Sequence, residues 1–120
     1  MKLGRKITGG RYKKSRKSRL FEKKRQPRVV KLAEKKVRAL KGVGGNKKLV
    51  SLAGNTINVV FKGKAKKATI KNVVETPSNR FLARQNILVK GAIIDTDLGK
   101  AKITNRPSQE GIIQGILLEK

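Results

Sequence analysis

The first 28 residues constrain this chain most, because they concentrate positive charge that no acidic partner balances. Residues 1–28 hold 13 lysines and arginines against one acid, Glu22, a net charge of +12 out of +25 for the chain. Their apolar side chains follow neither a helical nor a strand period, so the segment has no face to bury. Without burial to offset the entropy of ordering, we expect an arm that is disordered when alone and is ordered by a polyanion.

Composition narrows the function classes for the whole chain. No run of 18 apolar residues exists, which argues against a membrane span, and the basic N-terminus does not resemble a secretory signal. Histidine and cysteine are absent, which removes the common proton shuttle, the best nucleophile and the soft metal ligands. We therefore expect a cytoplasmic protein that is not an enzyme and has no metal site, no cofactor, no membrane partner and no small-molecule substrate.

Positive charge continues beyond the arm and then fades. Residues 29–72 carry a net charge of +11, whereas residues 73–120 carry only +2. A charge gradient of this kind is typical of a protein that binds a polyanion, since solubility alone does not require it. With one tyrosine, three phenylalanines and no tryptophan, a platform of stacking aromatic side chains is not expected.

Residues 29–120 show the pattern of a small β-protein, with short apolar runs separated by turn residues at roughly ten-residue spacing. Strands are predicted at 36–41, 48–52, 56–61, 67–75, 87–89, 92–95, 101–104 and 112–118. Ile57, Val59 and Phe61 would share one inward face, and Val73-Val74 would form a bulge. The glycine-rich stretch 42–46 lacks the spacing of a nucleotide-binding loop and is predicted to be a hairpin turn. The fold class is thus all-β: a small antiparallel β-barrel or sandwich, with one short helix and a basic disordered N-terminal arm.

The one predicted helix follows Ser78, which can cap it. Arg80 and Arg84 lie four residues apart and so share a helix face. They are either a solvent-screened pair or two guanidinium forks aimed at adjacent phosphates or a flipped-out base, and the second interpretation is favoured in so basic a chain. Phe81 and Leu82 are expected to face the core.

Two short motifs leave alternatives open. Gly9-Gly10, after Thr8, is either a flexible break or a place where the backbone approaches a phosphate closely, with equal weight. Asp95 and Asp97 could be a metal pair or an acid dyad, but acids are common at hairpin turns and no third ligand is nearby in sequence. We therefore favour a structural role for these two acids.

Blocks of residues spread over essentially the full chain carry a family resemblance. They are Arg5-Lys6-Ile7-Thr8-Gly9-Gly10, Asn72-Val73-Val74-Glu75, Asn79-Arg80, Arg84-Gln85-Asn86-Ile87, Lys90-Gly91-Ala92-Ile93-Ile94 and Arg106-Pro107. In this order they resemble the ribosomal protein eight-e family of the archaeal and eukaryotic small subunit. Eukaryotic members have a large insertion in the body that this chain lacks, which points to the archaeal type.

The resemblance implies a structural constituent of the small ribosomal subunit, located on cytoplasmic ribosomes. Its partners would be small-subunit ribosomal RNA and neighbouring ribosomal proteins. An RNA-binding arm, residues 1–28, would thread among RNA helices, and a β-barrel body, residues 29–120, would sit on the RNA. The predicted RNA-binding residues are Arg5, Lys6, Thr8, Gly9, Gly10, Arg11, Lys13, Lys14, Arg16, Lys17, Arg19, Lys23, Lys24, Arg25, Arg80, Arg84 and Lys90.

Three other classes fit parts of the pattern. Composition alone also permits a DNA-compacting chromatin protein, which is the main alternative. A cationic protein acting on anionic membranes is disfavoured because the arm lacks an amphipathic stripe. A nuclease would have to use Asp95 and Asp97.

Overall fold

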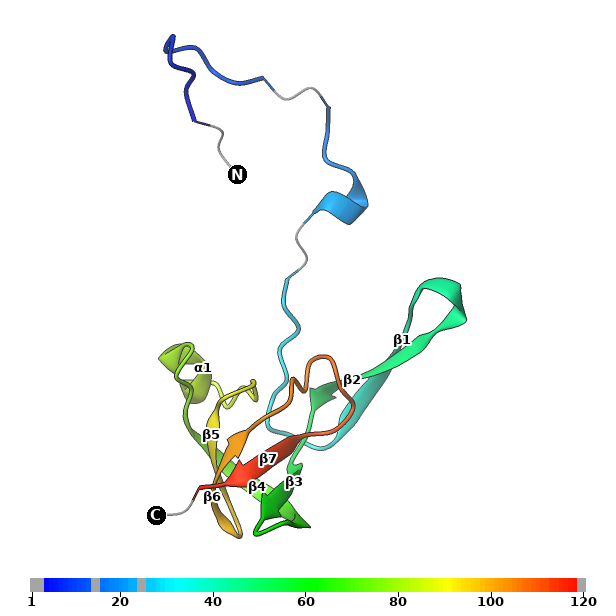
Figure 1. Cartoon of the computed structure of the whole chain (residues 1–120), viewed down its shortest axis with the longest axis vertical. Helices are drawn as coiled ribbons and strands as arrows, with labels where there is room; N and C mark the ends of the chain where they lie inside the picture. The colour runs from blue at the N-terminus through cyan, green and yellow to red at the C-terminus, as the bar shows by residue number, and fades with distance from the viewer. Residues whose placement is uncertain (1–3, 14–15, 24–25, 119–120) are drawn as a thin grey trace.

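The structure, a computed structural model, describes residues 4–13, 16–23 and 26–118. Five strands form a closed barrel in the order β3-β4-β5-β6-β7, and two more, β1 and β2, form a separate hairpin beside it (Figure 1). The strands are β1 (Lys36–Lys41), β2 (Lys47–Ala53), β3 (Thr56–Phe61), β4 (Lys64–Glu75), β5 (Ile93–Thr96), β6 (Gly99–Ile103) and β7 (Gln114–Leu117). The helical elements are α1 (Arg80–Arg84) and two 3-10 turns, η1 (Leu20–Glu22) and η2 (Val43–Gly45). The predicted all-β barrel with one short helix is confirmed.

The barrel closes through a parallel pair, which the prediction of an antiparallel barrel missed. Each strand runs antiparallel to the next along the chain, but β3 and β7 pair in parallel, with Val59 opposite Gly115. The reason is the odd number of strands: when five strands alternate in direction, the first and the fifth point the same way. The prediction also did not separate the β1–β2 hairpin from the barrel, whereas in the structure these two strands form a sheet of their own.

Alternating apolar side chains fill the barrel, as predicted from the sequence. Ile57 and Val59 of β3, Ile94 of β5 and Ile103 of β6 are almost fully buried in one cluster. Burying an isoleucine of this kind stabilises the fold by about 1.5–3 kcal/mol. Phe61 was predicted to share this face, but it is 37% exposed at the end of β3. The strand ends there at a turn, and Phe61 lies against the Lys62 ammonium at 5.3 Å instead of against the core.

Two features of the barrel wall depend on particular residues. The pairing of β4 with β5 shifts register between Ile70 and Asn72 and again between Val73 and Glu75, which confirms the predicted bulge. Gly115 of β7 has no room for a side chain, since a Cβ there would lie 2.7 Å from the Lys102 carbonyl oxygen. Close backbone approach therefore fixes glycine at this position.

The region around α1 corrects two predictions, the capping residue and the inward orientation of Phe81. Asn79, not Ser78, caps the helix, and its side chain accepts a hydrogen bond from the Phe81 backbone N–H at 3.0 Å. Phe81 is 59% exposed and Leu82 is partly buried, whereas Ala83 packs against the core. A helix of one turn has its orientation set by its neighbours, so its own apolar pattern decides little.

The segment after α1 was predicted to be a strand, but it forms only one bridge. Ile87 pairs with Lys31, and no strand continues through residues 87–89. Ile87 and Leu88 are nevertheless buried, which explains why the sequence pattern was apolar there.

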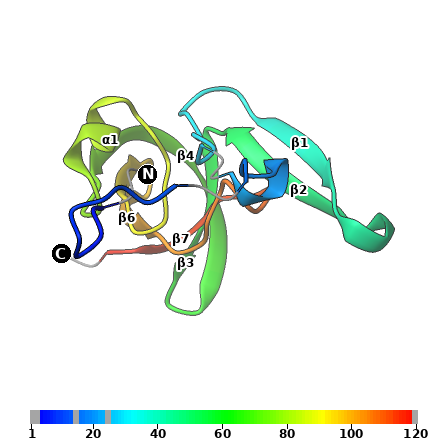
Figure 2. The ribbon, with the colours of Figure 1, turned by 90° about the horizontal axis from the view of Figure 1, so that it is seen from above.

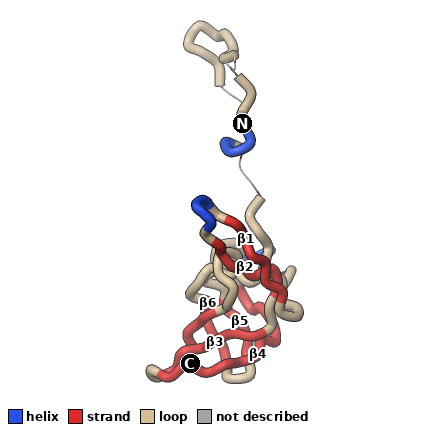
Figure 3. The backbone as a smooth tube through the Cα atoms, turned by 90° about the vertical axis from the view of Figure 1, so that its right-hand side faces the viewer, coloured by secondary structure: helices blue, strands red, loops and turns tan. Residues whose placement is uncertain are grey.

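The described part of the arm lies away from the barrel, as the views in Figure 1 and Figure 3 show. The Cα radius of gyration is 19.5 Å, whereas a compact chain of this length has about 14 Å. Every described residue before Val30 is exposed, and Val30 is the first to enter the core. The predicted division into an arm, residues 1–28, and a separately folded body, residues 29–120, stays a prediction.

Candidate nucleic-acid interface

The arm joins the body at Val30 and Lys31, called here the root of the arm, next to both the hairpin and the α1 region. The Leu88 N–H donates to the Val30 carbonyl at 2.8 Å, and the Lys31 N–H donates to the Leu52 carbonyl at 3.2 Å. Lys31 also forms bridges to Ala53, at the end of β2, and to Ile87, after α1. The arm thus leaves the body between the hairpin and the α1 region, which lie on opposite flanks of the barrel in Figure 2.

The first part of the arm turns back on itself at the double glycine. The Lys6 N–H donates to the Gly10 carbonyl and the Gly9 N–H donates to the Lys6 carbonyl, both at 2.9 Å. Gly9 has a φ of 76°, a conformation that glycine adopts without strain. The turn accounts for the glycine at position 9, and the predicted phosphate contact at Gly9-Gly10 stays a prediction.

The same turn brings like charges together. Arg5 and Arg11 face each other as a bridge pair, and the Lys6 ammonium lies 5.7 Å from the ring of Tyr12. Like charges directly opposite each other destabilise a strand pair by a few tenths of a kcal/mol or more.

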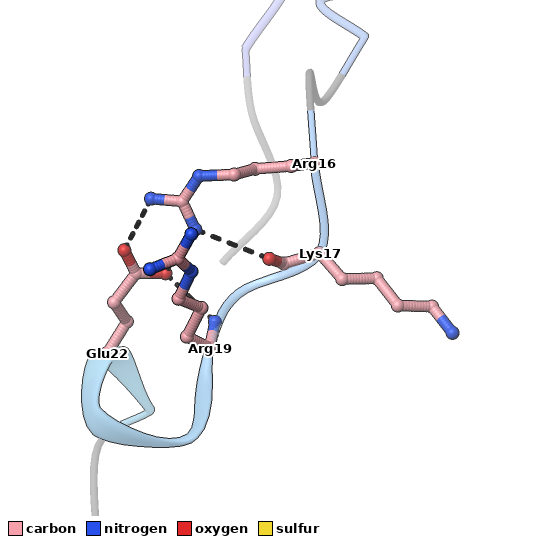
Figure 4. A network of polar contacts seen from close by, with 4 residues as sticks. All are labelled: Arg16, Lys17, Arg19 and Glu22. Atoms are coloured by element: carbon pink, nitrogen blue, oxygen red, sulfur yellow. Dashed lines mark hydrogen bonds and ion pairs between the residues drawn. The ribbon is translucent and has the colours of Figure 1, made fainter.

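Glu22, the one acid of the arm, is held within the arm itself (Figure 4). The Arg16 guanidinium donates two hydrogen bonds to its carboxylate, Nη2 to Oε1 at 2.6 Å and Nη1 to Oε2 at 2.9 Å. The Arg19 backbone N–H donates a third, at 3.0 Å. The Arg16 guanidinium, and secondly the Arg19 N–H, hold the pKa of Glu22 below its usual range, and the pair raises the pKa of Arg16 further. Arg16 is therefore occupied inside the arm before any ligand binds.

The other predicted arm residues present their charges outward. Lys17, Arg19 and Lys23 are exposed and make no ion pair with any described residue. Arg5, Lys6, Thr8, Gly9, Gly10, Arg11 and Lys13 belong to the first turn or its flank and are likewise exposed. The predicted residues Lys14, Lys24 and Arg25 lie outside the described residues.

The three predicted residues of the body do not form one group. Arg80 and Arg84 line the same open pocket of about 430 Å³ between α1 and the bulged end of β4. Lys90 is exposed in the turn that Gly91 completes with a φ of 83°, and it does not line that pocket.

The β1–β2 hairpin is a basic element that the sequence-based list of site residues missed. Its two strands carry five basic side chains and no acid: Lys36, Arg38, Lys41, Lys47 and Lys48. Lys41 lies directly opposite Lys47 next to the turn, and Val43 in that turn is 94% exposed. The sequence did contain a signal for this hairpin: residues 29–72 carry a net charge of +11, and part of that charge lies in these two strands, which have no acid.

Asp95 and Asp97, the candidate metal pair or acid dyad, lie beside basic side chains instead. Asp97 forms an ion pair with Lys71 at 3.5 Å, and Asp95 lies opposite Lys100 in the β5–β6 pair. Among residues 4–13, 16–23 and 26–118, no three acidic, histidine or cysteine side chains are grouped to hold a metal ion. Within the same described ranges, no helix has the length and apolar character to cross a membrane.

Comparisons with known proteins converge on one family. A family model described as ribosomal protein S8e matches residues 1–118. A small ribosomal subunit protein eS8 of Sulfurisphaera tokodaii is 44% identical over 119 residues, covering 97% of this chain and 93% of the relative. The protein of the same name from Methanocorpusculum labreanum is 42% identical over 117 residues, covering 96% and 94%. That from Nanoarchaeum equitans is 41% identical over 115 residues, covering 94% and 91%.

Proposed function

Because this chain belongs to the ribosomal protein S8e family, we propose that it is a structural component of the small ribosomal subunit that binds ribosomal RNA. It works on ribosomes in the cytoplasm, next to other ribosomal proteins. The role is architectural rather than catalytic, in keeping with a family of ribosomal proteins. The RNA-binding elements are the arm of residues 1–28, the β1–β2 hairpin and the α1 region of the body.

One observation carries the proposal: the arm has a net charge of +12, and its described side chains are all exposed. Its single acid is already engaged with Arg16. The remaining described cations of the arm form no ion pair with a described residue, so their charge is left unbalanced within the arm. RNA phosphates supply the balancing charge, and the counterions they release drive binding.

The length of the arm and the positions of the hairpin and α1 support contact with several RNA segments at once. An extended arm of 28 residues spans up to about 90 Å at roughly 3.3 Å per residue. The hairpin and α1 flank the root of this arm, so RNA that follows the arm down to the body meets basic side chains on either side. Recognition of this kind depends on the shape and the phosphates of folded RNA more than on base sequence.

Salt dependence of binding to transcribed small-subunit ribosomal RNA tests the proposal. Neutralising on the order of ten phosphates gives a log–log slope of about −7 to −9. A slope shallower than about −2 contradicts the proposed mechanism. Duplex DNA of matched length, at matched salt, is the competitor that distinguishes the alternative of a chromatin protein: equal affinity for DNA and RNA would favour that alternative.

A further inference from the structure

The pocket between β4 and α1 has a chemistry that charge neutralisation alone does not explain. Arg80 and Arg84 line it from the helix, and Asn72 and Asn86 line it from the β4 bulge and from the residues after the helix. Two arginines and two asparagines thus line one open space of about 430 Å³. That volume is within the range of small-ligand sites, about 300–1,000 Å³.

The two asparagine side chains are fixed through their oxygens and keep their amide nitrogens free. The Val73 N–H lies 2.9 Å from Asn72 Oδ1 and 3.4 Å from Asn86 Oδ1, so both oxygens accept from the same donor. Neither Nδ2 group has a hydrogen-bond partner among the described residues. Asn86 is further held by a φ of 52° and by backbone bonds to Leu32 and Ala83. The pocket lining therefore includes two carboxamides with unpartnered N–H donors, beside two arginines that form no ion pair with a described residue.

A further residue of the pocket lining has a buried hydroxyl. Thr76, another lining residue, is 1% exposed, and its Oγ1 has no hydrogen-bond partner within the described chain. Buried polar atoms are rarely left unpaired, since each costs about 1–3 kcal/mol. Glu75 adds a carboxylate at the rim, which can accept a hydrogen bond from an exocyclic amine.

From this arrangement we infer that the pocket holds one unstacked nucleotide of the bound RNA. Arg80 and Arg84 grip its phosphate, and the amides of Asn72 and Asn86 hydrogen-bond the edge of its base. Val73 and Ala83 are apolar neighbours on which the base is seated. Sequence-specific recognition of RNA uses such splayed-out bases, because the edges of paired bases are hidden in the helix. The inference rests on the proposed function and adds to it a single position where the base is read.

Asparagine-to-aspartate substitutions test the base contact in the full-length protein. Asn86→Asp keeps the oxygen that accepts from Val73 and suits the positive φ, but it removes the free N–H donor. Asn58→Asp is the matched control: it adds the same charge at an exposed position on β3 that does not line this pocket. We expect Asn86→Asp to weaken binding to transcribed small-subunit RNA about tenfold, and Asn58→Asp about twofold or less. Equal losses would overturn the inference.

Arginine-to-lysine substitutions test the phosphate contact and remain informative if Asn86→Asp does not fold. Arg80→Lys with Arg84→Lys preserves charge and removes the bidentate forks from two exposed side chains. The expected result is an affinity loss of about tenfold with an unchanged salt slope. Arg106→Lys, outside the pocket, is the control that is expected to change nothing. Unchanged affinity in the double variant would show that the pair acts only as diffuse charge.

Ultraviolet crosslinking of the wild-type complex locates the nucleotide directly. The inference predicts a covalent adduct between residues 72–86 and a nucleotide that is unpaired in the RNA. Adducts confined to the arm would overturn the pocket while leaving the proposed function intact. Failure of the wild-type chain to bind small-subunit RNA would instead overturn the proposed function itself.

Discussion

Ile7 in the arm and Ile94 in the barrel are residues of the same type with opposite exposure to solvent. Ile7 is fully exposed, whereas Ile94 is 0% exposed at the centre of the core. The arm has local turns but no buried side chain among its described residues, while the barrel buries one apolar face on each of its strands. The difference teaches that the barrel carries the source of its stability within itself, whereas the arm, which buries no described side chain, is expected to need a partner to hold one shape.

Removing charge from the arm is expected to have the largest effect on RNA binding. The triple variant Lys13→Gln, Lys17→Gln, Lys23→Gln removes three exposed cations without touching the barrel. Losing three phosphate contacts lowers affinity by about 10²–10³-fold at 0.1 M salt and reduces the salt slope by about 2–3. Binding isotherms over a salt series measure both quantities.

The control removes the same charge from the barrel: Lys66→Gln, Lys100→Gln and Lys102→Gln, all exposed on β4 and β6. A smaller loss is expected there, because these side chains lie outside the three proposed RNA-binding elements. Equal losses in the two triple variants would mean that the arm has no privileged role.

The matched pair Ile94→Ala and Ile7→Ala sharpens the comparison on the side of stability. Truncating a buried isoleucine leaves a cavity and is expected to lower the free energy of unfolding by about 2–5 kcal/mol. The same truncation at Ile7 removes no burial and is expected to change it by less than about 0.5 kcal/mol. Urea unfolding followed by circular dichroism gives both values. A comparable loss at Ile7 would mean that the arm packs on the body.

The β1–β2 hairpin offers a case in which stability and binding move in opposite directions. Lys41→Gln with Lys47→Gln removes two like charges that face each other across the strands. Thermal stability is therefore expected to rise slightly, by a few tenths of a kcal/mol, because cross-strand repulsion is relieved. RNA affinity is expected to fall about tenfold or more, because two phosphate contacts are lost. A fall in stability together with unchanged affinity would contradict this role for the hairpin.

The smallest expected effect concerns the Arg16–Glu22 pair. Arg16, and secondly the Arg19 N–H, lower the pKa of Glu22, so the contact is fully present above the ordinary glutamate pKa and is lost as pH falls through the lowered value. Side-chain carboxyl shifts of Glu22, followed by NMR between pH 2 and 7, report this titration. Arg16→Gln is expected to move the apparent pKa of Glu22 back up. An unmoved titration would show that the contact does not persist in solution.

Much of the barrel could be predicted from local pattern. Strand alternation correctly placed Ala68 and Ile70 inward, and the interruption at Val73 correctly indicated a bulge. Local pattern failed where a residue's environment is set from far along the chain. The parallel closure of β3 on β7 follows from the count of strands, and the orientation of Phe81 follows from what packs against α1.

The candidate interface was predictable only in part. Charge density along the chain is enough to make the arm a candidate, because a net charge of +12 over 28 residues is a local property, and RNA binding by the arm stays a prediction. Charge density could not show that Arg16 forms an ion pair with Glu22. It also could not show that Asn72 and Asn86 line the same pocket as Arg80. Those contacts depend on turns and register shifts, which composition does not encode.

Amide hydrogen exchange on the full-length protein, with and without small-subunit ribosomal RNA, tests the central claim most directly. In the free protein, amides of β3 to β7 are expected to be strongly protected. Those of residues 4–13 and 16–23 are expected to exchange at nearly unprotected rates, since one-turn structures without tertiary contacts open readily. Addition of the RNA is expected to protect the arm amides. Strong protection of the arm in the RNA-free protein would contradict the account.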